Sequence, residues 1–561
     1  MRVAMRPSSL YDIMQTATAV MEAKEPPAIE YIHMDDSSAL IPGGAVALQS
    51  REGRGLILQY VALGLLYGII PSLVYPLFNL YLGLTGYEVL AYSILISFGW
   101  LLKIFFSVLS DCVPIRGYRR KPWMLLGWMT TCISLAFLTL ANFHDPFCRI
   151  RPRTEAACNY TRLDSLSAAE RDATYNMETQ AHGHQFVIAS VLIGLGYAMV
   201  SAAADAVTVH YAQREPLPRR GYVAAVMYAI RTLAAVVGHV YVCIFTNSRG
   251  LGGSFDFDVA PNVGYGLLLV PSCIALVGTA RDVVEPRMEA VRLSSWLHQL
   301  YQLMQSRVLW QVVAFRVLHN LFASFHSNAL LPLAEQWGNV TALDASIMDT
   351  LSLLVIALGF FAIARAGLLW NWRYLVAGSS ILAVVVDMAL VLLTIWDVRR
   401  GPYIVLWVPF ADSLCIAIRF LVAFFCAIEI AERGNEGTVA SLVTNAHNWS
   451  TPLGTLLYST VDKTLGVSDS MWLDDSDADR WHVTTSMLIS FAAQLLALLW
   501  LVLLPPQKIE LQYLKNEGGR SLCAARALVG TLLLGLTFAI VVTTLTLTPD
   551  AACFRLANGH C

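Results

Sequence analysis

Residues 110–124 read SDCVPIRGYRRKPWM and separate two stretches of the chain that are almost wholly apolar. Pro114 cannot continue a helix interior, Gly117 permits a tight turn, and Pro122 suits the first turn of a new helix. The same segment gathers four cations behind a single acid, namely Asp111 followed by Arg116, Arg119, Arg120 and Lys121. The stretch therefore predicts a tight basic hairpin between two apolar helices.

The composition of the whole chain is that of a membrane protein. Hydrophobic residues make up 56% of the 561 residues and charged residues 14%, and the mean hydropathy is +0.57. Soluble globular domains are less apolar and more highly charged. A net charge of −2 gives no reason to expect a nucleic-acid partner. The eleven cysteines form no CxxC pair, and the sequence points to no metal and no cofactor.

A bilayer core about 30 Å thick needs about 20 apolar residues in a helix. Expected spans lie near 56–79, 89–110, 123–141, 186–210, 221–245, 264–280, 308–332, 346–369, 374–396, 403–428, 437–460 and 483–504. We therefore expect an all-α membrane protein with halves over 56–280 and 308–504, joined by a cytoplasmic linker over 281–307. Residues 1–55 are expected to be a largely disordered cytoplasmic tail, and 505–561 a second tail in which the apolar run 527–547 forms a thirteenth span.

The distribution of cations predicts the orientation. Lys and Arg collect in the loops after the second, fourth, sixth and eighth spans, and the positive-inside rule places those loops in the cytoplasm. Two Asn-x-Thr sequons, at Asn159 and Asn339, then fall on the outer side and are candidate glycosylation sites. Cys148 and Cys158 share one outer loop, where they either pair or remain independent thiols. We expect a multi-pass protein of the plasma membrane that acts as a monomer.

Three motifs resemble the folate–biopterin transporter family, a branch of the major facilitator superfamily. They are the hairpin after a span that contains Lys103, the segment ERGNEGT over 432–438, and Ala204-Asp205-Ala206 in the fourth span. The resemblance covers roughly 56–504 and implies two six-helix halves, with Asp111, Gly117, Arg119, Arg120 and Lys121 as the gating loop. Ile104 stands where that family has a proline after the lysine, a departure that concerns the substrate rather than the fold.

Charged side chains within the spans are candidates for function, because a charge at the bilayer centre costs roughly 2.5–3.5 kcal/mol on insertion scales. Asp205 lies on a polar stripe of the fourth span, and Arg231 and Arg316 are suited to binding a carboxylate. The expected substrate-binding or coupling residues are Asp205, Arg231, Arg316, Lys103, His319 and Asn445. The alternative is that Asp205 forms a structural ion pair, with Arg231 as its partner.

The function expected from these features is secondary active transport of a folate- or pterin-type metabolite, coupled to protons. Alternatives are transport of S-adenosylmethionine, pyruvate or another organic anion, and a polytopic receptor. No phosphate-binding loop, HExxH or GxSxG motif is present, so we expect no enzyme. The partners are then a small-molecule substrate and the lipid bilayer. We further expect Asp111 and the Arg119/Arg120 pair to bond across the cytoplasmic seam between the halves when the protein faces outward.

Overall fold

The protein is described from a computed structural model that covers residues 38–84, 86–143, 145–149, 167, 170, 173–246, 248, 255–257, 259–287, 292–405, 407–467 and 475–546. These residues form helices and loops and contain no β-strand. Ten of the helices among them are long and apolar enough to cross a membrane. The expected all-α membrane fold is confirmed.

The first half contains six spans. They are α2 (Arg51–Ile69) with the short turns η2 (Pro71–Leu73) and η3 (Val74–Tyr81), α3 (Gly86–Leu101) with α4 (Lys103–Cys112), α5 (Lys121–Leu140), α7 (Met177–Gln213), α8 (Tyr222–Phe245) and α9 (Pro261–Asp282). Each follows an apolar stretch of the sequence, and the helical axis is interrupted in the second span at Leu102. The linker then forms α10 (Leu293–Gln305).

The second half has six helical segments, of which four are among the ten candidate spans; the other two, 307–337 and 436–464, are divided into shorter helices. The six segments are α11 (Arg307–Ala323) with α12 (Leu330–Pro332) and η6 (Leu333–Trp337), α13 (Ala342–Ala362) with η7 (Ile363–Gly367), α14 (Trp372–Ile395), α16 (Trp407–Ile430) preceded by α15 (Pro402–Val405), α17 (Glu436–Thr444) with α18 (Ala446–Thr464), and α20 (Asp477–Leu496) with η8 (Ala497–Leu503). The chain continues as α21 (Lys508–Glu517) and α22 (Leu522–Thr546).

Two expected spans, 308–332 and 437–460, are each divided into shorter helices. The first is interrupted after Ala323, where the carboxylate of Asp462 accepts hydrogen bonds from the Ser327 hydroxyl (3.0 Å) and the Asn328 N–H (2.8 Å). The second is interrupted at Asn445. Irregular backbone at membrane depth is tolerated where protein groups satisfy it. Sequence hydropathy cannot locate such breaks, because the residues around them remain apolar enough to count as spans.

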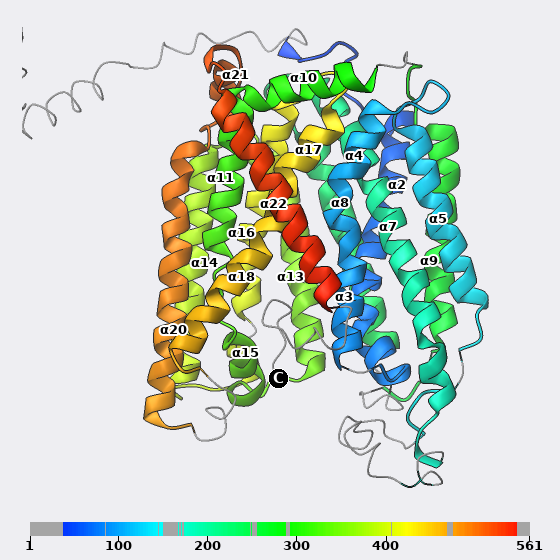
Figure 1. Cartoon of the computed structure of the whole chain (residues 1–561), viewed down its shortest axis with the longest axis vertical. Coiled ribbons are helices and arrows are strands. Elements are labelled where there is room, and N and C mark those ends of the chain that lie inside the picture. The colour runs from blue at the N-terminus through cyan, green and yellow to red at the C-terminus, as the bar shows by residue number, and fades with distance from the viewer. Residues whose placement is uncertain are drawn as a thin grey trace, which may run out of the picture.

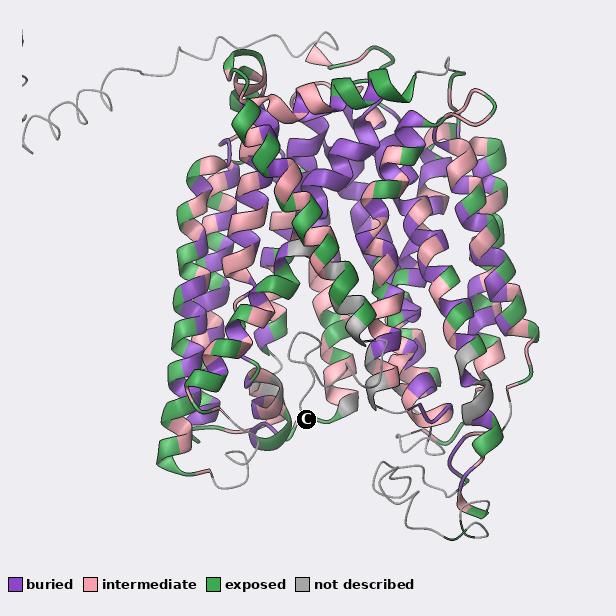
Figure 2. Cartoon of the chain, in the orientation of Figure 1, coloured by how far each residue is buried: buried purple, intermediate pink, exposed green. Residues whose placement is uncertain are grey.

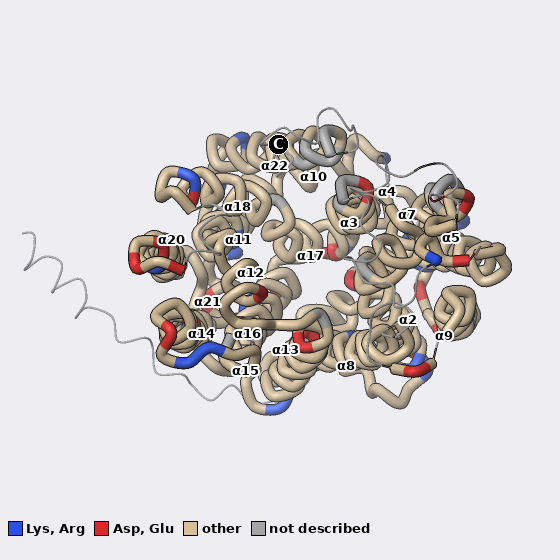
Figure 3. The backbone as a smooth tube through the Cα atoms, turned by 90° about the horizontal axis from the view of Figure 1, so that it is seen from below, with Lys and Arg blue, Asp and Glu red and all other residues tan. Residues whose placement is uncertain are grey.

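The two halves lie side by side (Figures 1 and 3). Helices α2, α3, α5, α7, α8 and α9 are on one side in Figure 3, and α11, α14, α16 and α20 are on the other. The halves contact each other where α8 packs against α13 and where α17 packs against α4 and α7. Two groups of apolar helices around one seam agree with the two-half, all-α fold that the sequence predicts.

Burial between the halves is concentrated at one end of the molecule. The loop 113–120, α10 and α21 all lie at this end, which is at the top of Figures 1 and 2, and the helices beneath them are largely buried. We call this end the basic face, because it carries the loops that the positive-inside rule places in the cytoplasm. The other end is called the opposite face below.

The tail before the first span differs from expectation where it is described. Residues 38–50 lie against the loop after α7: the N–H groups of Leu40 and Ile41 donate to the Gln213 carbonyl, and Arg214 donates to the Gly43 and Gly44 carbonyls. These bonds hold the segment before α2 in place. Residues 1–37, also expected to be disordered, lie outside the described residues.

The last helix, α22, contacts both halves. It packs against α10, α11 and α18 and also against α3 of the first half, and it runs obliquely across the seam in Figure 1. It begins on the basic face, where Ser521 N–H donates to the Gln305 carbonyl. Its 25 residues correspond to a length of about 37 Å, which exceeds the bilayer core.

We predict that α22 is a true thirteenth span, so that a tag fused to the C-terminus is reached by antibody on intact cells. The physical reason is that a helix of this length and apolarity that begins on the basic face emerges on the other side. A tag inserted at Asp36 serves as the internal control and should be reached only after permeabilisation. Detection of both tags only in permeabilised cells would show that α22 lies against the inner leaflet.

Candidate functional site

The hairpin expected from residues 110–124 is present on the basic face. Ile115 and Tyr118 exchange two backbone hydrogen bonds of 2.9 and 3.1 Å, which close a tight turn. Gly117 has φ 85° within it, a left-handed conformation that glycine adopts without strain. Lys121 begins α5, and Pro122 occupies its first turn.

Asp111 lies at the end of α4 and is fully buried against the second half. Its carboxylate accepts hydrogen bonds from the Thr438 N–H (2.7 Å) and the Thr438 hydroxyl (2.9 Å) in the first turn of α17. A Cβ at Gly437 would lie 3.3 Å from this carboxylate and 3.0 Å from the Ala206 Cβ, so glycine favours the close approach of the two halves. The bonds of Asp111 thus cross the seam between the halves, and their donors lie at a helix N-terminus, which also favours an anion.

Arg120 forms a second contact across the same seam, with a different acid. Its guanidinium forms a 2.6 Å ion pair with Glu436 at the start of α17. The backbone N–H groups of Arg119, Arg120 and Lys121 donate to the Glu285 carboxylate at 2.9 to 3.1 Å, which caps α5 from the linker. The hairpin is therefore bonded to both the second half and the linker.

The linker helix α10 covers these contacts. Trp296 donates from its indole nitrogen to the Gly434 carbonyl in the loop before α17 (2.9 Å). Trp296 and Leu300 also form a small buried cluster with Cys112 at the end of α4. One helix of the linker thus contacts both halves at the closed seam, a role that its sequence did not indicate.

A second charged network closes the seam beside the hairpin. Arg220, in the loop before α8, donates to both carboxylate oxygens of Glu429 at the end of α16 (3.1 and 3.0 Å). Lys508 of α21 donates to the Arg220 carbonyl (2.7 Å), and burial lowers the pKa of Lys508 to about 8. Burial also raises the pKa of the nearby Glu215 to about 7. Both networks are fixed at the basic face.

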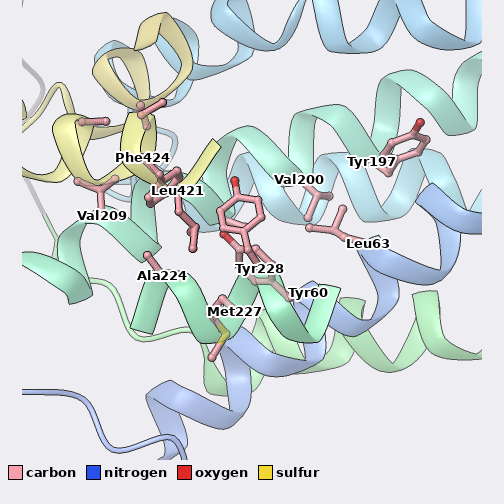
Figure 4. Close-up of a cluster of buried hydrophobic side chains, with 14 of the residues drawn as sticks. Tyr60, Leu63, Tyr197, Val200, Val209, Ala224, Met227, Tyr228, Leu421 and Phe424 are labelled. Carbon is pink, nitrogen blue, oxygen red and sulfur yellow. The ribbon is translucent and has the colours of Figure 1, made fainter. Parts of the chain in front are cut away.

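Within the first half, Asp205 and Lys103 form a buried ion pair of 2.5 Å. The Asp205 carboxylate also accepts hydrogen bonds from the hydroxyls of Tyr60 (2.8 Å) and Tyr228 (2.7 Å). The two tyrosine rings meet edge to face, as Figure 4 shows, at a centroid separation of 5.5 Å. Asp205 is thus fully paired, and its partner is Lys103 at the break between α3 and α4 rather than the expected Arg231.

Arg231 has aromatic rings around its guanidinium in place of an acid. The guanidinium carbon lies 4.8 Å from the Tyr67 ring, 4.9 Å from the Trp100 ring and 5.8 Å from the Tyr228 ring. Such contacts are favourable but leave the N–H donors free for an anion. No carboxylate of the described residues lies within 4 Å of it. Tyr67 keeps 40% of its surface exposed although it lies in the middle of a span.

The second half presents a similar group of cations. Arg316 of α11 is buried and donates only to backbone carbonyls, those of Val443 (3.3 Å) and Arg419 (3.2 Å). One turn on, His319 Nε2 and Asn320 Nδ2 are buried without a hydrogen-bond partner in the described structure. The charges of Arg316, Arg419 and Lys103 all act on His447, so groups from both halves surround one region.

The structure brings the expected site residues into this region from both sides. Lys103, Asp205 and Arg231 lie in the first half, Arg316 and His319 in the second, and Asn445 donates to the Trp100 carbonyl across the seam (3.4 Å). Sequence reasoning missed the roles of Tyr228, Trp100, Glu436 and Trp296, since none of these carries a spacing signal. No group of three or more His, Cys, Asp or Glu residues suited to a metal ion occurs in the described ranges.

The structure describes only some of the features expected in the outer loops. Asn339 is exposed in a turn on the opposite face, with φ 52°, and Asn159 lies outside the described residues. Cys148 takes part in a disulfide, and Cys158, the expected partner, also lies outside the described residues. Glycosylation at the two sequons stays a prediction.

Comparison with known proteins bears on the fold alone. No protein-family model matches the sequence, and no curated protein matches it either. Similar solved structures include a bacterial homologue of the iron transporter ferroportin in an outward-facing state (13% identity, 82% of this chain and 99% of that one, TM-score 0.49). Others are the human organic anion transporter MFSD10 (16%, 78% and 97%, TM-score 0.42) and the major facilitator superfamily proton:xylose symporter XylE (14%, 80% and 94%, TM-score 0.49).

These likenesses, with TM-scores below 0.5, carry no conclusion about substrate or coupling. They do not support the narrower resemblance to the folate–biopterin family, which stays a prediction.

We predict that Arg120→Gln opens the basic face. Loss of the ion pair leaves Glu436 buried without its cation and weakens the seam. The measurement is the rate at which a membrane-permeant maleimide modifies Cys112. This thiol is 6% exposed and lies buried in the closed seam. We expect a several-fold faster rate, quantified by mass spectrometry of the Cys112 peptide. Arg116→Gln removes the same charge from an exposed position of the same hairpin and should leave the rate unchanged. An unchanged rate in Arg120→Gln would mean that the ion pair does not hold the seam.

We further predict that Lys103→Met and Asp205→Asn each destabilise the protein, whereas the double variant recovers most of the loss. Removing one partner of a buried ion pair typically costs about 3–5 kcal/mol, because the other charge stays buried and unpaired. Thermal unfolding of the detergent-solubilised protein measures the effect, and Lys463→Met, at an exposed lysine, is the control. Additive losses in the double variant would show that the two residues act independently.

Proposed function

We propose that this protein is a secondary transporter of a small organic anion that works by alternating access between its halves. The observation that carries the proposal is the presence of two buried arginines on opposite halves, Arg231 and Arg316, without a carboxylate partner in the described structure. Burying an unpaired guanidinium is unfavourable unless a ligand completes it. An anion that touches both arginines would draw the two halves together.

The contacts across the seam indicate how access could alternate. The side-chain bonds from Asp111, Arg120 and Arg220 to the second half all lie toward the basic face. In the proposed cycle, this bonded end closes the seam while substrate enters the region around Arg231 and Arg316 from the opposite face. Rocking of one half against the other must break these bonds before substrate is released on the basic face.

A flat conjugated anion suits the aromatic surroundings of Arg231. The rings of Tyr67 and Trp100 both lie within 5 Å of its guanidinium, and such rings can stack on a planar ligand. Together with the three motifs that resemble the folate–biopterin family, this favours a folate or another carboxylated pterin. Asp205 was expected to take part in substrate binding or coupling, but three donors already occupy its carboxylate, so we assign it a structural role.

The proposal takes the chain to act as a monomer in the plasma membrane. The expected proton coupling is treated separately below, because it depends on different residues.

We predict that Arg231→Lys and Arg316→Lys each reduce uptake of a carboxylated substrate by about tenfold or more. Lysine keeps the charge but loses the planar pair of N–H donors, and a charge-assisted hydrogen bond contributes about 1.5–3 kcal/mol. The measurement is uptake of labelled folate, biopterin, pyruvate and S-adenosylmethionine by cells expressing the protein at matched surface abundance. Neutral biopterin should be affected least.

The matched control is Arg400→Lys, since this arginine pairs with Asp475 at the opposite face. Uptake of every tested anion by both arginine variants at the wild-type rate would contradict the proposed site. Failure of wild-type protein to carry any compound of the panel would contradict the substrate class.

A further inference from the structure

One acid within the second half has no hydrogen-bond or ion-pair partner among the described residues. Asp387 lies on α14 and is 3% exposed, and its Oδ1 has no hydrogen-bond partner in the described structure. Neither carboxylate oxygen takes part in an ion pair there. A buried carboxylate without donors is strongly disfavoured in its charged form, because it has lost its hydration and gained nothing in return.

The charge that acts on Asp387 adds to this cost, because it belongs to a second acid. Helix α14 packs against α16, α20, α15, η6 and η8. Of the ionisable groups on these elements only Asp412 of α16 interacts electrostatically with Asp387, and the interaction is a repulsion. The remaining charged groups and the histidine on these elements do not act on the charge of Asp387. They are Glu335, Arg419, Glu429, Asp477, Asp479, Arg480 and His482.

Asp412 in turn connects this acid to a solvent-accessible histidine. His326 lies in the break between α11 and α12, is exposed, and interacts electrostatically with both Asp412 and Arg419. Its Nδ1 lies 3.3 Å from the Gln494 side-chain nitrogen. The three groups Asp387, Asp412 and His326 therefore form a short series from a buried position to an exposed one. The series lies toward the opposite face rather than toward the bonded basic face.

Two carboxylates that repel each other, one of them buried without a donor in the described structure, are disfavoured when both are ionised. A positive species that neutralises one of them relieves this cost. Metal ions require several oxygen or nitrogen ligands, and no such group of three or more residues occurs in the described part of the chain. A proton needs only one carboxylate oxygen.

We propose that the pair Asp387 and Asp412 holds one exchangeable proton, received from the opposite face through His326, and that this proton drives the transport proposed above. Protonation removes a negative charge from the neighbourhood of Arg419, two turns along α16 from Asp412. An anion near Arg316 and Arg419 is then bound more favourably. The proton enters as H⁺ from one side, binds a carboxylate oxygen, and leaves from the same oxygen on the other side.

The first experiment is independent of any substrate. Infrared difference spectra of the purified protein in proteoliposomes, recorded between alkaline and acidic pH, report the C=O stretch of each carboxyl that gains a proton. We expect Asp387→Asn, which is uncharged and nearly isosteric, to lack one band that the wild type shows. Asp349→Asn, at an exposed acid of α13 in the same half, should keep that band. Retention of the band by Asp387→Asn would overturn the proposal.

Sodium provides the second arm, because a Na⁺ site would also neutralise the pair. Replacing choline with sodium in the buffer should leave the band unchanged. If sodium abolishes it, the pair binds a metal cation and the proton proposal is overturned.

The third arm uses labelled folate in the same proteoliposomes. We expect Asp387→Asn to exchange internal for external folate at close to the wild-type rate but to lose accumulation driven by a pH gradient, since exchange needs no net proton movement. This part rests on the proposed function, whereas the infrared arm does not. Accumulation at the wild-type level by Asp387→Asn would overturn the coupling role even if the band were lost. Absence of all folate movement in the wild type, with the Asp387 band present, would reject folate transport and leave the proton site standing.

Discussion

A charge buried between membrane helices has to be compensated, and the way in which each one is compensated divides this protein into parts with different roles. Asp205 and Lys103 neutralise each other within the first half. Arg120 pairs with Glu436, and Arg220 with Glu429, across the seam. Arg231, Arg316 and Asp387 have no partner of opposite charge in the described structure. Pairs within a half stabilise that half, and pairs across the seam stabilise one conformation. The groups without a partner of opposite charge are candidates to bind a ligand.

The closed end of the seam is built from segments that are distant in the sequence. The hairpin supplies Arg120, the linker supplies Glu285 and Trp296, and the segment after the last span of the second half supplies Lys508. Each of these residues contacts an element that must move when the halves rock. Opening the basic face therefore requires several bonds to break together, and the conformational change should be cooperative.

The two halves differ in how they hold charge. In the first half, aromatic side chains surround Arg231, and tyrosine hydroxyls complete Asp205. In the second half, the helices beside the cations are interrupted, at Asn445 and after Ala323, and His319 and Asp387 keep buried polar atoms without partners. The first half thus pairs its buried acid fully and leaves one arginine among aromatic rings, whereas the second half contains several buried polar groups without partners in the described structure.

The sequence by itself determined the order of the apolar segments, the hairpin and the all-α fold, because hydropathy and the residues Pro114, Gly117 and Pro122 act locally. It also indicated which charges lie at membrane depth, Lys103, Asp205, Arg231 and Arg316 among them. Only the tertiary structure decided which of these charges are paired. Lys103 is 102 residues from Asp205, and Arg120 is 316 residues from Glu436. Such distances in sequence carry no periodic signal, so a bound charge and a free one look alike until the helices are packed.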